Sequence, residues 1–136
     1  TEYQIYNWMH YIWLSGDQIA EQAVHNIDTM NWIMGGPPES AYGSGGRFTR
    51  PEGSEMWDNV EVDYVYPGNR LVSFMCRQIP STASDNSNTI YGSKGTLKMS
   101  VNKFEFFEGN SKQPALSQNY LNELDLFEED RTEMDL

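Results

Sequence analysis

The chain has 136 residues, of which 38% are hydrophobic and 13% aromatic, so it is long enough to fold as one domain that buries about two thirds of its unfolded surface. Nine lysines and arginines against twenty aspartates and glutamates give a net charge of −11, which repels phosphate backbones and anionic membranes and argues against nucleic-acid binding. No apolar run reaches the roughly eighteen residues of a membrane span, and the first residues do not resemble a signal peptide. We therefore expect a soluble, bacterial-type cytoplasmic or periplasmic protein.

The sequence also lacks the patterns that bind metals and nucleotides. The histidines and the single cysteine, Cys76, do not have zinc-ligand spacing, and no phosphate-cradling glycine loop is present. Cys76 has no partner for an internal disulfide, and its position in the apolar run LVSFMC predicts a small buried hydrophobe. We expect this chain to bind no cofactor and no metal by itself.

The first half of the chain is predicted to be helical. Residues 3–14 are rich in aromatic side chains and are expected to run from helix into extended chain, packed against the helix that follows. Ser15 and Gln18 have the spacing of a capping box, and Asp17 adds favourable charge to the first turn of that helix. The glycine and proline pairs at residues 35–38 predict where it ends, because glycine accepts a left-handed conformation and proline cannot continue a helix.

This long helix carries two kinds of face. Its apolar residues cover a wide arc, which predicts that the helix is mostly buried: Ile19, Ala20, Ala23, Val24, Ile27, Met30, Ile33 and Met34. Four residues at positions i, i+4, i+7 and i+11 line up on the remaining side: Glu21, His25, Asp28 and Trp32. By spacing alone this row is either a solvated stripe with an i,i+4 ion pair or the wall of a cleft.

A glycine-rich loop and a hairpin follow the helix. Residues 40–43 are predicted to form a short strand, and the glycines and proline of residues 43–51 predict a mobile loop that holds Arg47 and Arg50. Apolar and acidic residues then alternate from Asn59 to Tyr66, and Pro67-Gly68-Asn69 supplies a turn into an extended run over residues 70–79. We expect one face of this hairpin to pack on the long helix and the other to meet a second subunit or domain.

The remaining elements are short. A polar loop at 80–88 precedes predicted strands at 89–91, 96–101 and 103–107, and residues 120–129 have weak helical spacing before an acidic tail, 130–136, that is expected to be disordered. This order of a helix first and strands afterwards predicts an α+β fold. We expect an open-faced, mainly antiparallel sheet of five or six strands with one long helix packed on one face.

Two segments give the chain a family resemblance. LSGDQIAEQAVHNIDTMNWIMGG resembles the acidic-x-x-x-His-x-x-Asp helix with a glycine stop, and TIYGSKGTLKM resembles the strand-Gly-x-x-Gly-strand turn, of the C-terminal domain of the glucose-fructose oxidoreductase / inositol dehydrogenase family, Gfo/Idh/MocA. The similarity covers most of residues 3–107. It implies a single substrate-binding and oligomerisation domain over residues 1–136, belonging to an oxidoreductase that acts on a sugar or cyclitol hydroxyl.

The resemblance also implies what this chain lacks. The family uses NAD or NADP held by an N-terminal Rossmann domain, and no glycine-rich dinucleotide fingerprint is present here. The Rossmann domain is therefore an expected partner absent from this chain, and the chain alone is not expected to turn over. A homo-oligomer formed through the sheet face and a sugar-like small molecule are the other expected partners.

Site roles follow from the same motif. His25 matches the family's general acid/base histidine, and histidine suits that role because it exchanges protons near neutral pH. Glu21 stands where most relatives have an aspartate, and the resemblance implies that it orients the imidazole. Asp28 is a candidate substrate contact or a structural brace; Trp13 and Tyr11 are candidate stacking surfaces for sugar C–H groups, and Arg47 is a candidate polar contact.

Two other functions remain open at this stage. The chain is alternatively a stand-alone, non-catalytic module that binds carbohydrate or pairs sheets. A divalent-metal site made by Glu21, His25 and Asp28 is a third interpretation, although three ligands on one helix rarely converge on one ion.

Overall fold

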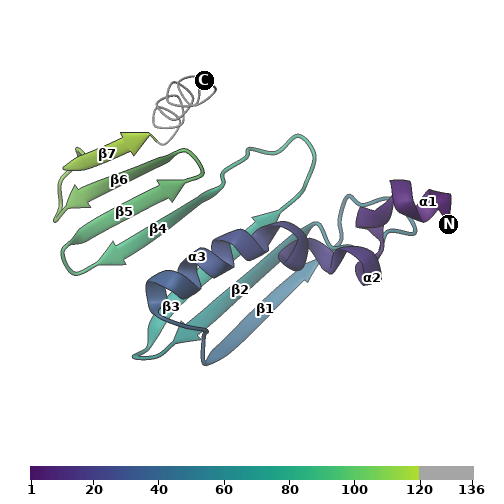
Figure 1. The fold of residues 1–136 in the computed structure, drawn as a ribbon, viewed down its shortest axis with the longest axis horizontal. Helices are drawn as coiled ribbons and strands as arrows, with labels where there is room; N and C mark the ends of the chain where they lie inside the picture. Colours follow the sequence, from purple (N-terminus) through teal and green to yellow (C-terminus); the bar gives the residue numbers. More distant parts are fainter. Residues whose placement is uncertain (120–136) are drawn as a thin grey trace, which may run out of the picture. The chain divides into compact units, whose positions relative to one another are not determined.

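The computed structural model describes residues 1–119, and the predictions for 120–129 and 130–136 lie outside the described residues. The chain divides into two compact units, Thr1–Ala83 and a second that begins at Ser84. The first unit contains helices and a three-stranded sheet, and the second contains a four-stranded sheet (Figure 1). All strand pairs in both sheets are antiparallel and both sheets are open, which confirms the predicted α+β class.

The helical part of the first unit consists of short turns followed by one long helical run. The turns are α1 (Glu2–Tyr6), the 3-10 turn η1 (Trp8–His10) and α2 (Ile12–Ser15). The long run comprises a π-helical turn, η2 (Ile19–Ala23), that continues directly into α3 (Val24–Met34). No helix among residues 1–119 is long and apolar enough to cross a membrane.

The predicted capping box at the start of the long helix is wrong. Ser15 closes α2 instead, because Gly16 adopts a left-handed conformation with φ 72° and ends that helix. Asp17 Oδ1 accepts the backbone N–H of the next residue, Gln18, at 2.7 Å, but no side-chain hydrogen bond caps the turn η2. The predicted stop is confirmed, since Gly35 has φ 82° and the N–H groups that follow the helix return to the carbonyls of its last turn.

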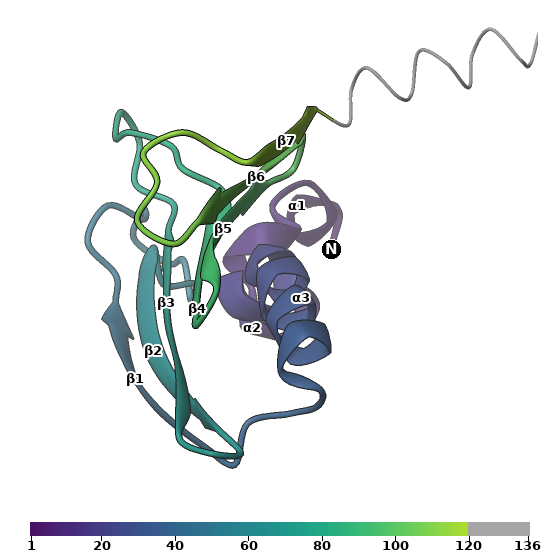
Figure 2. The same ribbon diagram turned by 90° about the vertical axis from the view of Figure 1, so that its left-hand side faces the viewer.

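The three-stranded sheet lies against α3. It consists of β1 (Ser40–Gly46), β2 (Asn59–Tyr66) and β3 (Arg70–Arg77) in that order. The helix runs along one face of this sheet in both views (Figures 1 and 2). The register from Tyr66 opposite Arg70 to Asn59 opposite Arg77 confirms the predicted hairpin. Strand β1 is longer than predicted, because its glycines remain extended and pair with β2 as far as Gly46.

One face of the hairpin packs on the long helix, as predicted. On the helix side Val60 and Tyr66 are buried, and the Tyr66 hydroxyl donates to Asn31 Oδ1 at 2.8 Å. On β3, Cys76 opposite Val60 and Val72 opposite Tyr64 lie on the same face and are half-buried. The outer face exposes the alternate residues, among them Tyr42, Leu71 and Met75.

The expectation of a mostly buried long helix is wrong. Within it Ala23 and Met30 alone are buried, whereas Val24 and Ile33 are each 42% exposed. Within the first unit, three strands cover one side of the helix, so the wide apolar arc exceeds the surface that this sheet can bury.

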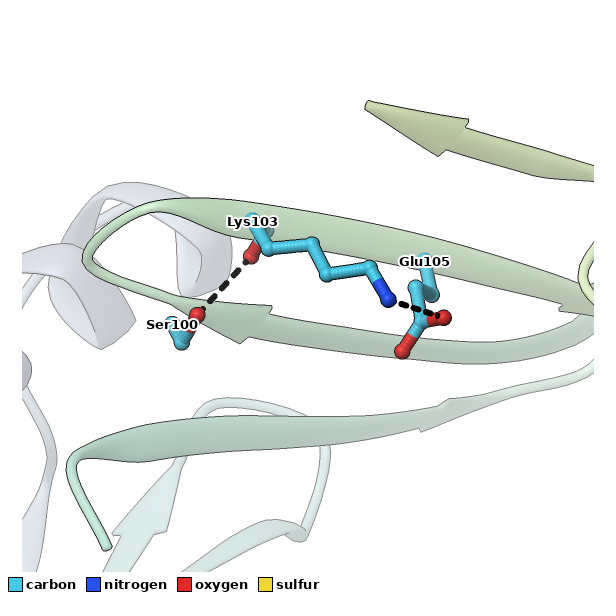
Figure 3. A network of polar contacts seen from close by, with 3 residues as sticks. All are labelled: Ser100, Lys103 and Glu105. Atoms are coloured by element: carbon cyan, nitrogen blue, oxygen red, sulfur yellow. Dashed lines mark hydrogen bonds and ion pairs between the residues drawn. The ribbon is translucent and has the colours of Figure 1, made fainter. Parts of the chain in front are cut away.

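The second unit is an antiparallel meander. Its strands are β4 (Ser87–Gly92), β5 (Gly95–Ser100), β6 (Lys103–Glu108) and β7 (Leu116–Asn119), in chain order. At the β5–β6 turn, Lys103 Nζ lies 2.7 Å from Glu105 Oε1, and the Ser100 hydroxyl donates to the Lys103 carbonyl at 3.3 Å (Figure 3). The described strands thus form two sheets in place of one, because the polar segment from 78 to 86 pairs with neither.

Candidate functional site

The row predicted on the long helix lies on the side away from the sheet. His25 and Asp28 are exposed and Trp32 is 83% exposed, whereas Glu21 is half-buried. Glu21 belongs to the π-helical turn η2, in which hydrogen bonds span five residues and each turn contains more residues than in an α-helix. The direction of Glu21 relative to His25 therefore differs from the one that α-helical spacing predicts.

The structure does not join Glu21 to His25 by a hydrogen bond. Glu21 Oε2 is buried and has no hydrogen-bond partner among the described residues. The backbone carbonyl of His25 accepts a hydrogen bond from the Thr29 hydroxyl at 2.8 Å. The roles of His25 and Glu21 stay predictions.

The candidate substrate contacts Tyr11, Trp13 and Arg47 lie close to one clasp. The clasp joins the N-terminal turns to residues 54–57 through four contacts: Glu55 N–H to the His10 carbonyl at 2.9 Å, Ile12 N–H to Glu55 Oε2 at 2.9 Å, Trp57 N–H to Asp17 Oδ1 at 3.2 Å, and His10 Nδ1 with Ser54 Oγ at 3.0 Å. The Arg47 guanidinium donates to the Ser54 carbonyl. Trp13 is 68% exposed and Tyr11 is half-buried.

Asp58 organises the loop between β1 and β2, and the sequence analysis missed it. Its side chain is fully buried and accepts hydrogen bonds from the backbone N–H groups of Phe48 at 2.9 Å, Thr49 at 2.6 Å and Arg50 at 3.2 Å, and from the Thr49 hydroxyl at 3.0 Å. Three successive N–H groups around one carboxylate form an anion-binding nest. The loop predicted to be mobile is therefore tied to an internal anion.

The pKa of Asp58 reports this environment. Burial by itself raises the pKa of the carboxyl, but the hydrogen bonds donated by the backbones of Thr49 and Phe48 and by the side chains of Thr49 and Asn59 lower it from 3.8 to about 2. The carboxylate is thus ionised at neutral pH.

A polar relay connects this loop to the helix. The Arg50 guanidinium, through Nη2, donates to Gln78 Oε1, and Gln78 Nε2 donates to Gln22 Oε1 at 2.5 Å. Gln78 is itself anchored, because its backbone N–H donates to the Asp58 carbonyl at 2.8 Å. The relay therefore reaches η2 at the residue directly after Glu21.

The thiol of Cys76 lies beside the fully buried Gln18. Burial raises the pKa of the Cys76 thiol, and the nearby Gln18 amide acts in the opposite direction. No hydrogen bond of normal geometry joins them, since neither amide atom of Gln18 has a hydrogen-bond partner among the described residues. Cys76 is half-buried, a smaller degree of burial than the sequence predicts.

A hollow of about 420 Å³ lies over the outer face of the three-stranded sheet, away from the helix row. Its lining includes Tyr42, Glu61, Asp63, Ser73 and Met75. The Ser73 hydroxyl donates to Asp63 Oδ1 at 2.7 Å. In the described part of the chain, no three histidine, cysteine or acidic side chains group as metal ligands would.

Comparison with known families identifies most of the chain. Residues 3–98 match the family model described as the GFO/IDH/MocA C-terminal domain. The matched stretch contains the helix row, the Asp58 loop, the hairpin and the glycine turn between β4 and β5. No curated protein sequence matches the chain.

Proposed function

This chain belongs to the GFO/IDH/MocA oxidoreductase family, of which it contains the C-terminal domain, and from this premise we propose that it binds the substrate of an NAD(P)-dependent enzyme acting on a sugar or cyclitol hydroxyl. The observation that carries the proposal is His25. It lies within the matched residues, exposed on the helix side that the sheet leaves open, one turn after a carboxylate.

The described residues do not fit a dinucleotide. Every strand pair is antiparallel, and none of residues 1–119 forms the parallel strand, glycine-rich turn and helix that hold a pyrophosphate. NAD or NADP is therefore assigned to a partner Rossmann domain. That cofactor supplies the oxidising power when it is bound, and this chain supplies the groups that handle the substrate.

The chemistry proposed for this chain is proton transfer and orientation. Oxidation of a secondary hydroxyl requires loss of its O–H proton, and a ring nitrogen of His25 is the acceptor. Glu21 holds the imidazole through hydrogen bonding when the site is closed, since apo hydrogen bonds in catalytic sites are often formed only in the complex. Asp28 and Arg47 offer hydrogen bonds to hydroxyl groups, and the exposed ring of Trp13 with Tyr11 offers a stacking surface.

A substrate panel tests this function. In the enzyme that joins this domain to its Rossmann partner, aldoses and inositols are supplied with NAD+ or NADP+ and the absorbance of the reduced nicotinamide is followed. We expect at least one polyol to be oxidised. A cofactor-loaded enzyme that oxidises none contradicts the proposal, and sugar binding by this chain without any oxidation favours the alternative of a carbohydrate-binding module.

The outer sheet face is proposed to form a homo-oligomer. Its support is the exposure of Tyr42 at 80%, Leu71 at 71% and Met75 at 54% on one surface. We expect Met75→Lys to weaken self-association at least tenfold, because burying an unpaired charge opposes the interface, as measured by light scattering after size exclusion. Val101→Lys, at a position 72% exposed in the other unit, is the matched control. An unchanged mass for Met75→Lys, or a monomeric parent chain, contradicts the assignment.

A further inference from the structure

Two of the three residues of the polar relay are hydrogen-bonded to Asp58 through their backbones. The Asp58 carboxylate accepts the backbone N–H of Arg50 at 3.2 Å, and the Asp58 carbonyl accepts the backbone N–H of Gln78 at 2.8 Å. The backbones of Arg50 and Gln78 are therefore both tied to Asp58, which keeps the two residues close together. The side chain of Arg50 donates to the side chain of Gln78, which in turn donates to the side chain of Gln22.

The relay ends on the least regular part of the helix. Gln22 lies in the π-helical turn η2, between Glu21 and the buried Ala23. A π-helical turn is wider than an α-helical one and is intrinsically less stable, so it persists where surrounding contacts hold it and is frequent at functional sites. The 2.5 Å hydrogen bond from Gln78 is such a contact.

The surroundings of the relay contain buried polar atoms that are not satisfied. Both amide atoms of Gln18, Oε2 of Glu21 and Nε of Arg50 are buried without a hydrogen-bond partner among the described residues. Gln18 is 0% exposed and lies four residues before Gln22. Each such atom lowers the stability of the fold. Unsatisfied buried polar groups are rare in native proteins and call for a specific reason, so we look for a functional role of this region.

We propose that Arg50, Gln78 and Gln22 are positioning residues, which fix the turn η2 and through it the direction of Glu21 relative to His25. The inference rests on the proposed function for its catalytic consequence, but its structural part is independent of it. Because Arg50 and Arg47 belong to the same Asp58-bound loop, the relay also ties the helix row to the loop that carries the candidate substrate contact Arg47.

Hydrogen–deuterium exchange of this chain tests the structural part. Gln22→Ala removes the helix end of the relay at an exposed position, and we expect the amides of residues 20–26 to exchange about threefold to tenfold faster, the equivalent of one lost hydrogen bond. Alanine has a higher helix propensity than glutamine, so an effect of propensity alone has the opposite sign. Exchange that is unchanged or slower overturns the proposal.

Further variants separate the relay from local damage. Arg50→Met is expected to give the same acceleration, Arg50→Lys to restore part of the protection because it keeps a donor, and the double variant Gln22→Ala with Arg50→Met to show no more than either single change. Arg77→Met is the matched control, since Arg77 lies one residue before Gln78 and its side chain forms an exposed ion pair with Glu61, 3.7 Å away, as its one polar contact among the described residues. Additive effects, or an equal response of Arg77→Met, contradict a relay.

Kinetics of the two-domain enzyme test the catalytic part. Gln22→Ala is expected to lower kcat about threefold to tenfold with little change in KM, because a displaced Glu21 affects proton transfer more than substrate binding. Faster exchange with an unchanged kcat overturns the positioning role while the proposed function stands. An unmodified enzyme without turnover contradicts the proposed function instead, and the exchange data still decide whether the relay exists.

Discussion

Asp58→Ala is expected to lower the free energy of unfolding by about 3 kcal/mol or more, because it leaves the N–H groups of Phe48, Thr49 and Arg50 without their acceptor. A domain of this size is stabilised by only about 5–15 kcal/mol, so this loss is a large fraction of the total. The measurement is urea unfolding followed by tryptophan fluorescence.

The matched control for this change is Asp63→Ala. Asp63 lies in the neighbouring strand but is exposed, and its side chain accepts a hydrogen bond from Ser73 alone among the described residues. We expect its removal to cost less than about 1 kcal/mol. Similar losses for the two variants contradict the assignment of Asp58 as the anchor of the loop.

The same carboxylate predicts a pH signature. Its folded pKa of about 2 lies below the ordinary 3.8, so its contribution is complete above about pH 5 and is lost as the pH falls through about 4 towards 2. The full shift corresponds to about 2 kcal/mol. Solvent screening reduces such a contribution, so we expect about 1–2 kcal/mol.

Unfolding the parent chain and Asp58→Asn at neutral pH and near pH 3 measures this contribution. The gap between their unfolding free energies is expected to narrow at the lower pH, because the parent carboxylate becomes protonated only as it unfolds. A gap that is constant between the two conditions contradicts a lowered pKa for Asp58.

Elements with local signals were predictable from the sequence. The hairpin follows from the alternation of residues 59–66 and the turn residues that come next, and its register is set by that short turn. The helix stop follows from Gly35, which has φ 82°. In both cases the determining residues are neighbours in the chain, so no tertiary information was needed.

The start of the long helix was ambiguous for a local reason. Ser15 and Asp17 both favour capping positions, and Gly16 between them ends one helix as easily as it precedes another. In the structure Ser15 belongs to α2, and no side chain caps the helical run that begins with η2. The π-helical turn at Ile19–Ala23 has no sequence signal, because the residues of this stretch follow an ordinary α-helical pattern.

Asp58 was missed because its partners lie eight to ten residues earlier in the chain. One signal was available. A loop with several successive backbone donors needs an acceptor, and Asp58 is the acidic residue directly before the predicted strand. Similarly, the apolar arc predicts which side of the helix faces the sheet. It does not predict how much of that arc the sheet covers, and Val24 and Ile33 remain exposed.

The site predictions came from the family motif, and the family assignment is confirmed by the match over residues 3–98. Spacing alone placed His25 and Glu21 on one side of an ideal α-helix. The relay through Gln22 was beyond sequence reasoning, because it joins Arg50, Gln78 and Gln22 from three separate segments of the chain.

His25→Ala is expected to lower kcat of the two-domain enzyme by about 100-fold or more, the scale of a lost general acid/base. The side chain is exposed, so its removal is expected to change the free energy of unfolding by no more than about 0.5 kcal/mol. Steady-state kinetics and urea unfolding of the same preparation separate the two effects. Added imidazole is expected to restore part of the activity, because it replaces the missing proton acceptor without restoring any packing.

The chain's other histidine, His10, serves as the control for His25→Ala. His10 contacts Ser54 at 3.0 Å in the clasp, so His10→Ala is expected to cost about 1 kcal/mol of stability while kcat changes by less than about threefold, since the ring is placed outside the helix row. The two histidines should therefore show opposite patterns, one losing turnover and the other losing stability. A His25→Ala enzyme with unaltered kcat, or a loss that tracks unfolding in both variants, removes His25 from the mechanism and leaves the helix row as a solvated stripe.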